Sequence, residues 1–172
     1  MIPPERAFQI LKEEGCSPRV VNHIKEVAKK SVEIAEKVSK NGHDVDIELV
    51  RIGALLHDIG RSKTHSIDHG VAGGKILRER GLDELAKFAE NHLGAGIPAD
   101  EAEELGLPNK DFLPESLEEK IVAYGDNLIQ DNEVISFEEA KKELIDELGS
   151  NHPTIERFQG IHEELKELGG VD

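Results

Sequence analysis

The residues with the clearest chemical potential in this chain are its histidines, of which there are eight in 172 residues. One of them forms the pair His57-Asp58 directly after the apolar run Ala54-Leu55-Leu56, at the end of a segment whose composition requires a largely buried helix. Burying an imidazole and a carboxylate without partners is costly. A divalent metal can partner both groups, because iron, manganese, cobalt, nickel and zinc accept imidazole nitrogen together with carboxylate oxygen.

Four further residues of metal-ligand type lie on the apolar side of helical patterns. Their neighbours three or four positions away are apolar, as Val20 and Val27 are for His23. Each residue alone is better explained by a structural role at the border of a core. Together they predict a metal site, because helical domains build such sites from ligands that converge from facing helices. The predicted ligands beside His57 and Asp58 are His23, His69, His92 and Asp126. The other four histidines are predicted to lie in loops or on the surface: His43, His65, His152 and His162.

Helices alone are expected to position these residues, since no segment alternates with a period of two. Apolar spacing and capping residues predict helices at 3–14, 18–40, 46–59, 68–80, 82–93, 116–129, 136–148 and 153–168, with one helical turn at 99–105. Two segments, Ser116-Leu117-Glu118-Glu119 and Ser136-Phe137-Glu138-Glu139, have the capping-box pattern. We therefore expect one all-α domain of about eight helices over residues 1–172, with the motifs in 19–129 and C-terminal helices in 133–169.

Composition and charge narrow the classes of function. The net charge of −15 repels polyanions, so duplex DNA and long RNA are not expected partners, whereas a small phosphorylated molecule can reach a metal. No apolar stretch approaches the roughly 20 residues of a membrane span, and the start of the chain does not resemble a signal peptide. The single Cys16 cannot form an internal disulfide, which fits a reducing compartment. We therefore expect a cytoplasmic protein that does not bind membranes.

The motif around the histidine–aspartate pair resembles a known family. The four residues His57-Asp58-Ile59-Gly60 match the HDIG signature of the HD-domain phosphohydrolases, which are metal-dependent enzymes. The order His23, His57-Asp58, Asp126 resembles the H…HD…D frame of that superfamily, in which these four residues bind the first metal. The resemblance extends from Arg19 to Ile129, about two thirds of the chain, and includes the flanking segment Ile121-Val122-Ala123-Tyr124-Gly125-Asp126-Asn127. It implies an HD-domain-like helical bundle.

Two of the remaining histidines bear on the number of metals. The segments His69-Gly70-Val71-Ala72-Gly73 and Asn91-His92-Leu93-Gly94 resemble the additional histidines of dinuclear members. In that case Asp58 would bridge two ions, with His69 and His92 on the second. Alternatively, both histidines would contact substrate phosphate above a single ion. We favour two ions of iron, manganese, cobalt or nickel, and magnesium or zinc remain open.

The resemblance also implies a mechanism. Water activated by the metal would attack phosphorus in line, and Asp58, Arg61 and Lys63 are the candidate catalytic residues. Arg61 and Lys63 would also bind the phosphate, although both are explained equally well as solvated loop residues. Arg19 is a third candidate for substrate binding, because it resembles an arginine near that position in nucleotidase-like members. Asp68 is expected to cap a helix rather than to orient a histidine or accept a proton.

The expected function is hydrolysis of a phosphate ester in a nucleotide or another small phosphorylated metabolite, either a monoester or a cyclic diester. One alternative is a dinuclear-iron oxygenase, since a few HD proteins resemble this ligand set yet use O₂. Another is a non-catalytic ligand-sensing module, which ranks last because none of the four core ligands is missing. The acidic, loop-rich segment 94–114 is predicted to form the rim of the pocket. The C-terminal helices would brace the core or form a homo-oligomer contact.

Overall fold

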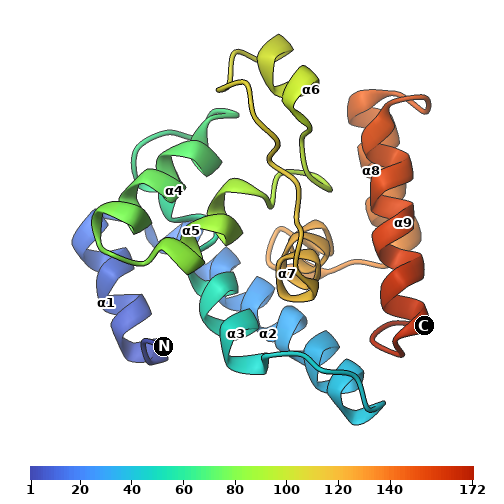
Figure 1. The fold of residues 1–172 in the computed structure, drawn as a ribbon, viewed down its shortest axis with the longest axis horizontal. Helices are drawn as coiled ribbons and strands as arrows, with labels where there is room; N and C mark the ends of the chain where they lie inside the picture. The colour runs from blue at the N-terminus through green and yellow to red at the C-terminus, as the bar shows by residue number, and fades with distance from the viewer.

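The computed structural model describes residues 1–172 and is mostly helical (Figure 1). Its elements in chain order are α1 (Pro4–Glu14), α2 (Pro18–Lys40), α3 (Ile47–Leu56), a 3-10 helix η1 (Ile59–Ser62), α4 (His69–Glu79), α5 (Asp83–Glu90), α6 (Ala99–Glu104), α7 (Leu117–Asn127), β1 (Ile129–Gln130), β2 (Glu133–Val134), α8 (Phe137–Leu148) and α9 (Pro153–Glu167). The predicted all-α fold class is confirmed. The structure has nine α-helices where about eight were expected, because the turn at 99–105 forms α6.

Capping side chains begin several of these helices where the sequence predicts them. Four N-cap side chains each accept a hydrogen bond from the main-chain N–H three residues later: Ser17, Asp46, Ser116 and Ser136. A complete capping box is present only at Ser136, where Glu139 binds back to the N-cap main chain. At the other expected box, Glu119 accepts from the main-chain N–H of Glu115 instead, so that box is only half formed. Local sequence thus determines where these helices begin.

The third helix is shorter than predicted, and its end matters for the site. It was expected to continue to residue 59, but α3 ends at Leu56, and Asp58 adopts φ −103° and ψ 14° before η1 begins. Apolar spacing continues through Ile59, which is fully buried, and therefore concealed the break. As a result the Asp58 side chain leaves the chain at a bend rather than from a regular helix.

The structure also contains a small sheet that the sequence does not predict. Strands β1 and β2 pair antiparallel, with Ile129 opposite Val134 and Gln130 opposite Glu133. The expectation of no sheet was therefore wrong, and the helix expected to reach residue 129 ends at Asn127. Strands of two residues are too short to show an alternating pattern, so periodicity cannot reveal them. The two residues between the strands, Asp131 and Asn132, form the tip of this hairpin.

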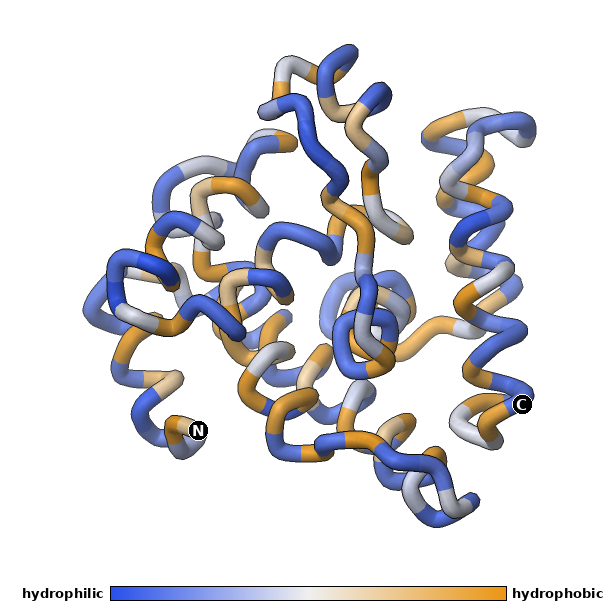
Figure 2. Tube along the Cα trace, in the orientation of Figure 1, coloured by the Kyte–Doolittle hydropathy of each residue, from blue (hydrophilic) through white to orange (hydrophobic).

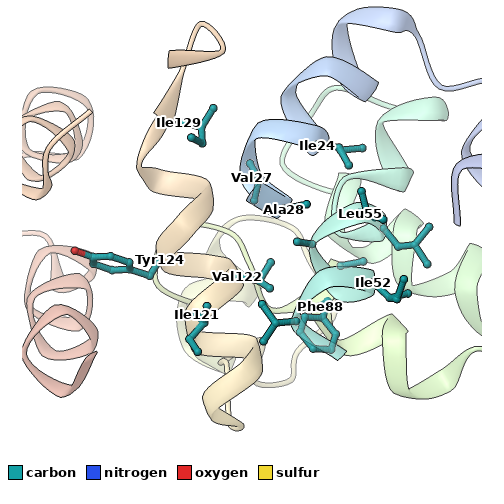
Figure 3. Packing of buried hydrophobic residues seen from close by; sticks show 14 of the residues in the cluster. Ile24, Val27, Ala28, Ile52, Leu55, Phe88, Ile121, Val122, Tyr124 and Ile129 are labelled. Atoms are coloured by element: carbon teal, nitrogen blue, oxygen red, sulfur yellow. The ribbon is translucent and has the colours of Figure 1, made fainter. Parts of the chain in front are cut away.

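Helix α7 lies between the two parts of the bundle. It packs against α2, α3 and α5 on one side and against α9 on the other, and α8 packs on α9. Figure 3 shows Val122 among the side chains of α2, α3 and α5, whereas Tyr124 points the opposite way, toward the C-terminal helices. These side chains belong to one cluster of 34 buried hydrophobic residues. A single core therefore holds the motif-bearing helices and the C-terminal pair together.

Hydropathy along the chain matches this arrangement. Apolar and polar residues alternate along nearly every helix in Figure 2, as expected for helices that bury one face and hydrate the other. The longest helix, α2, buries nine of its residues and carries many charged ones. None of the helices combines the length and apolar character needed to cross a membrane.

Candidate metal centre and adjoining pocket

Asp58 lies at the centre of the predicted ligand cluster, and its two carboxylate oxygens face different histidines. Its Oδ1 lies 3.3 Å from Nε2 of His69 and 3.3 Å from Nε2 of His92. Its Oδ2 lies 3.7 Å from Nε2 of His23 and 3.7 Å from Nε2 of His57. Only 3% of Asp58 is exposed. Each oxygen of the carboxylate thus faces its own pair of imidazole nitrogens, and the two pairs adjoin where His57 meets His92.

Asp126 completes one side of this cluster from α7. Its Oδ1 lies 2.9 Å from Nε2 of His23 and 3.4 Å from Nε2 of His57. Ligand atoms of His23, His57 and Asp126 lie within 4.8 Å of one another, as do those of His57, Asp58 and His92. The structure therefore brings together all six residues that the sequence offers as metal ligands.

The orientation of the histidine rings is set by main-chain carbonyls. In three of them Nδ1 donates to the carbonyl three residues earlier: His57 to Ala54 at 2.6 Å, His69 to Ser66 at 2.8 Å, and His92 to Ala89 at 2.8 Å. A carbonyl only accepts, so Nδ1 carries the proton and Nε2 of the neutral ring presents a lone pair. Metal-binding histidines are oriented in this way in proteins.

Several buried polar atoms of the cluster lack partners of the right kind. Neither His57 Nε2 nor Asp58 Oδ1 has a hydrogen-bond partner, although both are fully buried atoms. The Nε2 atoms of His69 and His92 lie 3.1 Å apart, so in the neutral tautomers two lone pairs face each other. Unsatisfied buried groups are costly, and a divalent cation satisfies nitrogen and oxygen lone pairs at once. The donor set and its geometry therefore fit a metal.

The charge state of the metal-free cluster is consistent with a cation site. Burial lowers the pKa of His57, but the negative charges of Asp58 and Asp126 outweigh burial and raise that pKa to about 9. Burial works against ionisation of the two carboxyls, yet the surrounding histidines hold the pKa of Asp58 and of Asp126 well below the usual range. Without metal, a proton on His57 thus supplies the positive charge that the carboxylates require.

Two glycines allow the second pair of histidines to approach Asp58. A methyl group at Gly60 would collide with the main-chain oxygen of His69, and one at Gly70 would lie 2.8 Å from the main-chain oxygen of Ala89. Helix α4 therefore packs directly against the main chain of η1 and of α5. This close packing brings His69 and His92 to the same carboxylate oxygen.

A family comparison agrees with this geometry, since the model of the HD domain matches residues 20–131. The chain belongs to the HD-domain family. The family is metal-dependent, and the six-residue cluster is this member's candidate metal centre. In solved structures, the chain is similar to the HD domain of the Listeria monocytogenes phosphodiesterase PgpH in complex with cyclic-di-AMP, with a TM-score of 0.56, 17% identity and coverage of 91% of this chain and 93% of that one. At this identity the likeness shows the shared HD-domain fold.

Relatives of this HD-domain chain fall into two lengths. An uncharacterized protein of Methanocaldococcus jannaschii is 51% identical over 165 residues, which cover 95% of this chain and 97% of that protein. Proteins named tRNA (cytidine(56)-2'-O)-methyltransferase from Picrophilus torridus and Thermoplasma volcanium are 40% and 38% identical over 99% and 100% of this chain. This chain spans 49% of the length of each of the two methyltransferases.

A pocket adjoins the metal centre on the side of Asp58 and His23. Its volume is about 580 Å³, within the range typical of small-molecule sites. It is lined by Ser17, Arg19, Val20, His23, Asp58, Arg61, His65, Asp131 and Asn132. Eight of these nine residues are polar, so the pocket suits a polar ligand that reaches the metal centre.

Only two of the three candidate substrate-binding residues line this pocket. Arg19 and Arg61 line the pocket, and Arg61 Nε donates to Asp58 Oδ2 at 3.3 Å. Lys63 lies outside the pocket lining, with 57% of its side chain exposed and Nζ 3.6 Å from a carboxylate oxygen of Glu14. Asp68 stands at the N-cap position of α4 but makes no side-chain cap, contrary to expectation, and it accepts a hydrogen bond from Thr64 instead.

Five residues of the pocket lining were not identified as site residues from the sequence: Ser17, Val20, His65, Asp131 and Asn132. His65 was predicted to be an ordinary loop residue, and its main-chain oxygen accepts from Arg61 Nη1 at 3.3 Å. Asp131 and Asn132 line the pocket from the tip of the β1–β2 hairpin. The only local signal for them is turn-forming chemistry, which does not say what a turn faces.

Proposed function

We propose that this chain is a metal-dependent phosphohydrolase that cleaves a phosphate ester of a nucleotide or another small phosphorylated metabolite. The observation that carries the proposal is the division of the Asp58 carboxylate between two histidine pairs. One ligand group contains His23, His57, Asp126 and Asp58 Oδ2. The other contains His69, His92 and Asp58 Oδ1. Two metals that share a carboxylate form a clamp suited to phosphoryl transfer.

The chain's own residues prepare this centre for the reaction. We propose two divalent ions of iron, manganese, cobalt or nickel, with magnesium or zinc as alternatives. When bound, such ions polarise phosphoryl oxygens and activate water for in-line attack. Asp58 fixes the separation of the two ligand groups, and Arg61 orients Asp58 through its hydrogen bond. The carbonyls behind His57, His69 and His92 keep each Nε2 pointed inward.

The pocket beside the metal centre suits a substrate that carries a phosphate group. Arg19 and Arg61 offer two guanidinium groups next to His23 and Asp58, and guanidinium binds phosphate by paired hydrogen bonds. Two guanidinium groups would also bind an anionic oxygenase substrate, so the O₂ measurement described below distinguishes that alternative. The complete set of inward-facing ligands likewise favours catalysis over a ligand-sensing module. Lys63 is not included in phosphate binding, because it lies beside Glu14.

Substrate size is limited by charge. Two relatives are named as tRNA methyltransferases, but this chain spans only about half of each, so that name describes more than the part shared here. The net charge of −15 opposes binding of a polyanion such as tRNA by this chain alone. We therefore propose a small phosphorylated substrate, either a monoester or a cyclic diester, and a location in the cytoplasm.

The proposal is tested by loading the chelator-treated protein with manganese, cobalt, nickel or magnesium and assaying nucleoside monophosphates, sugar phosphates, p-nitrophenyl phosphate and cyclic dinucleotides. Metal-dependent phosphate or nucleotide release that disappears in the His57→Ala, Asp58→Ala double variant supports it. Iron-dependent O₂ consumption without phosphate release would instead identify an oxygenase. Hydrolysis that persists in the double variant would rule out this centre as the active site.

A further inference from the structure

The tip of the β1–β2 hairpin has an unusual combination of backbone and position. Asp131 and Asn132 have φ values of 49° and 65°, and they are the only non-glycine residues of the chain with positive φ. Positive φ at both central residues of a two-residue hairpin is typical of a type I′ turn, in which glycine is the preferred second residue. Glycine adopts this backbone without cost, whereas Asn132 retains a side chain at some cost.

Asn132 and its neighbour Asp131 line the pocket beside the metal centre. Neither residue is a candidate metal ligand, and both are exposed. Neither side chain takes part in a hydrogen bond or an ion pair within the chain. The hairpin itself is held in place, because β1 packs on α2 and α7 and the N–H of Ile135 donates to the carbonyl of Leu128. Two free polar side chains are thus presented to the pocket from a supported turn.

The pocket therefore contains two chemically different kinds of side chain. Arg19 and Arg61 provide positive charge for a phosphate, whereas Asp131 provides an anionic hydrogen-bond acceptor and Asn132 an amide that both donates and accepts. An acceptor carboxylate disfavours a second phosphate and favours N–H or O–H donors. Asn and Asp are among the side chains that bind the polar edges of nucleobases by such hydrogen bonds.

We propose that Asp131 and Asn132 form the specificity element of this pocket, which binds the uncharged, hydrogen-bonding end of the substrate while the phosphate lies at the metal centre. The ligand chemistry is that of a nucleoside monophosphate, whose base or ribose carries the donors. This inference rests on the proposed function, because it assumes that the phosphate end of the same ligand occupies the metal centre.

The test measures binding, so that it does not depend on turnover. Nucleoside 5′-phosphonates in which a methylene group replaces the ester oxygen cannot be hydrolysed at that position. Their dissociation constants for the metal-loaded protein are measured by calorimetry for the four common bases, with ribose 5-methylenephosphonate and methylphosphonate as references. We expect at least one nucleoside analogue to bind about tenfold or more tightly than methylphosphonate, which corresponds to one or two hydrogen bonds.

Two variants test whether the hairpin causes this difference in affinity between nucleoside analogues and methylphosphonate. Asp131→Asn removes the charge, and Asn132→Gly removes the side chain while retaining a residue suited to positive φ. Each should reduce the ratio of nucleoside to methylphosphonate affinity by about threefold to tenfold. The midpoint of thermal unfolding should be unchanged or raised in Asn132→Gly, which excludes misfolding. Glu133→Gln is the matched control, since it removes the same charge from the same hairpin at a residue outside the pocket lining and should leave the ratio unchanged.

The outcomes separate this inference from the proposed function. A ratio that is the same in wild type, Asp131→Asn and Asn132→Gly would overturn the inference even if the enzyme hydrolyses phosphate esters. Absence of metal-dependent hydrolysis together with a hairpin-dependent ratio would instead count against the proposed function. Ribose 5-methylenephosphonate that binds as tightly as the nucleosides would identify the sugar as the contacted group, and weaker binding would identify the base. If all the nucleoside analogues bind only as tightly as methylphosphonate, the inference is contradicted outright.

Discussion

Two groups of aromatic and histidine side chains lie on opposite sides of α7, and they differ in how their ring nitrogens are used. His162 and Phe137 on the C-terminal side are half-buried, whereas His57, His69 and His92 in the metal centre are buried. On the C-terminal side, the ring of His162 stacks on Phe137 with centroids 3.7 Å apart and planes 6° apart, and its Nδ1 is hydrogen-bonded to the Tyr124 hydroxyl at 2.7 Å. On the other side, His57, His69 and His92 direct their Nε2 atoms toward one carboxylate.

The difference shows that packing against aromatic side chains does not by itself make a histidine functional. Burial lowers the pKa of His162, and its Tyr124 contact is complete without any ligand. In the metal centre, Nδ1 is satisfied by main chain while Nε2 of His57 has no partner. A histidine that turns its unpaired nitrogen toward other ligands therefore indicates a site, whereas one with a closed hydrogen bond indicates packing.

The largest expected effect is on the hydrolysis rate, which should depend on the metal centre and not on the aromatic group around His162. Asp58→Ala removes the shared carboxylate and should reduce the metal-dependent hydrolysis rate by about a thousandfold or more, because metal stabilisation of transition-state charge contributes several kcal/mol. His162→Gln should stay within about twofold of wild type, since His162 lies outside the pocket. Steady-state rates at saturating manganese measure both. Similar losses in the two variants would refute the proposed division between site and packing.

The pH dependence of stability gives the next effect. The pKa of about 9 for His57 exceeds its ordinary value of 6.5, so the folded metal-free protein holds this proton more tightly than the unfolded chain does. The resulting stabilisation is fully present below pH about 6.5 and is lost as pH rises through about 9, by an amount on the order of 3 kcal/mol. Urea unfolding between pH 6 and 9.5 with a chelator measures it. Metal-loaded protein should not show this loss, because a bound metal takes the place of the proton on His57. Identical dependence of unfolding free energy on pH with and without metal would contradict the account.

A close approach of main chains supports the second histidine pair, and breaking it should have a moderate effect. Gly60→Ala places a methyl group against the His69 carbonyl and should destabilise the fold by about 1–3 kcal/mol through forced backbone shifts. It should also weaken metal binding, because α4 carries His69. Gly160→Ala is the control, since a methyl group there meets no atom within 4 Å. Thermal unfolding and metal titration of both variants give the comparison, and equal behaviour would show that η1 and α4 need not pack so closely.

The smallest expected effect lies in the C-terminal group. Tyr124→Phe removes the hydroxyl that is hydrogen-bonded to His162 and should cost about 1 kcal/mol of unfolding free energy, with activity unchanged within about twofold. Denaturant unfolding and the hydrolysis assay measure these together. A large loss of activity without a loss of stability would mean that the C-terminal helices contribute to the site.

Much of the metal centre was predictable because its ligands stand at helical offsets from apolar residues or within a recognisable motif. His23 and Asp126 are examples of the first, and His57-Asp58 of the second. The pocket was less predictable. The break after α3 was concealed by apolar residues that continue to Ile59, and Lys63 follows the motif closely yet points to Glu14.

The hairpin tip could not be predicted for a different reason. Asp131 and Asn132 are ordinary turn residues, and only the packing of β1 on α2 and α7 brings them to a pocket whose other residues lie far away in sequence. His65 was missed likewise, because a loop residue has no periodicity that could show its direction.

The central claim, that Asp58 joins two metal-binding groups, is tested most directly by counting metal ions per chain. Protein reconstituted with manganese or cobalt and freed of excess is analysed by inductively coupled plasma mass spectrometry. We expect about two ions in the wild type and about one in the His69→Gln, His92→Gln double variant, which keeps His23, His57 and Asp126. One ion in both proteins would contradict the claim and would leave His69 and His92 as substrate contacts above a single metal.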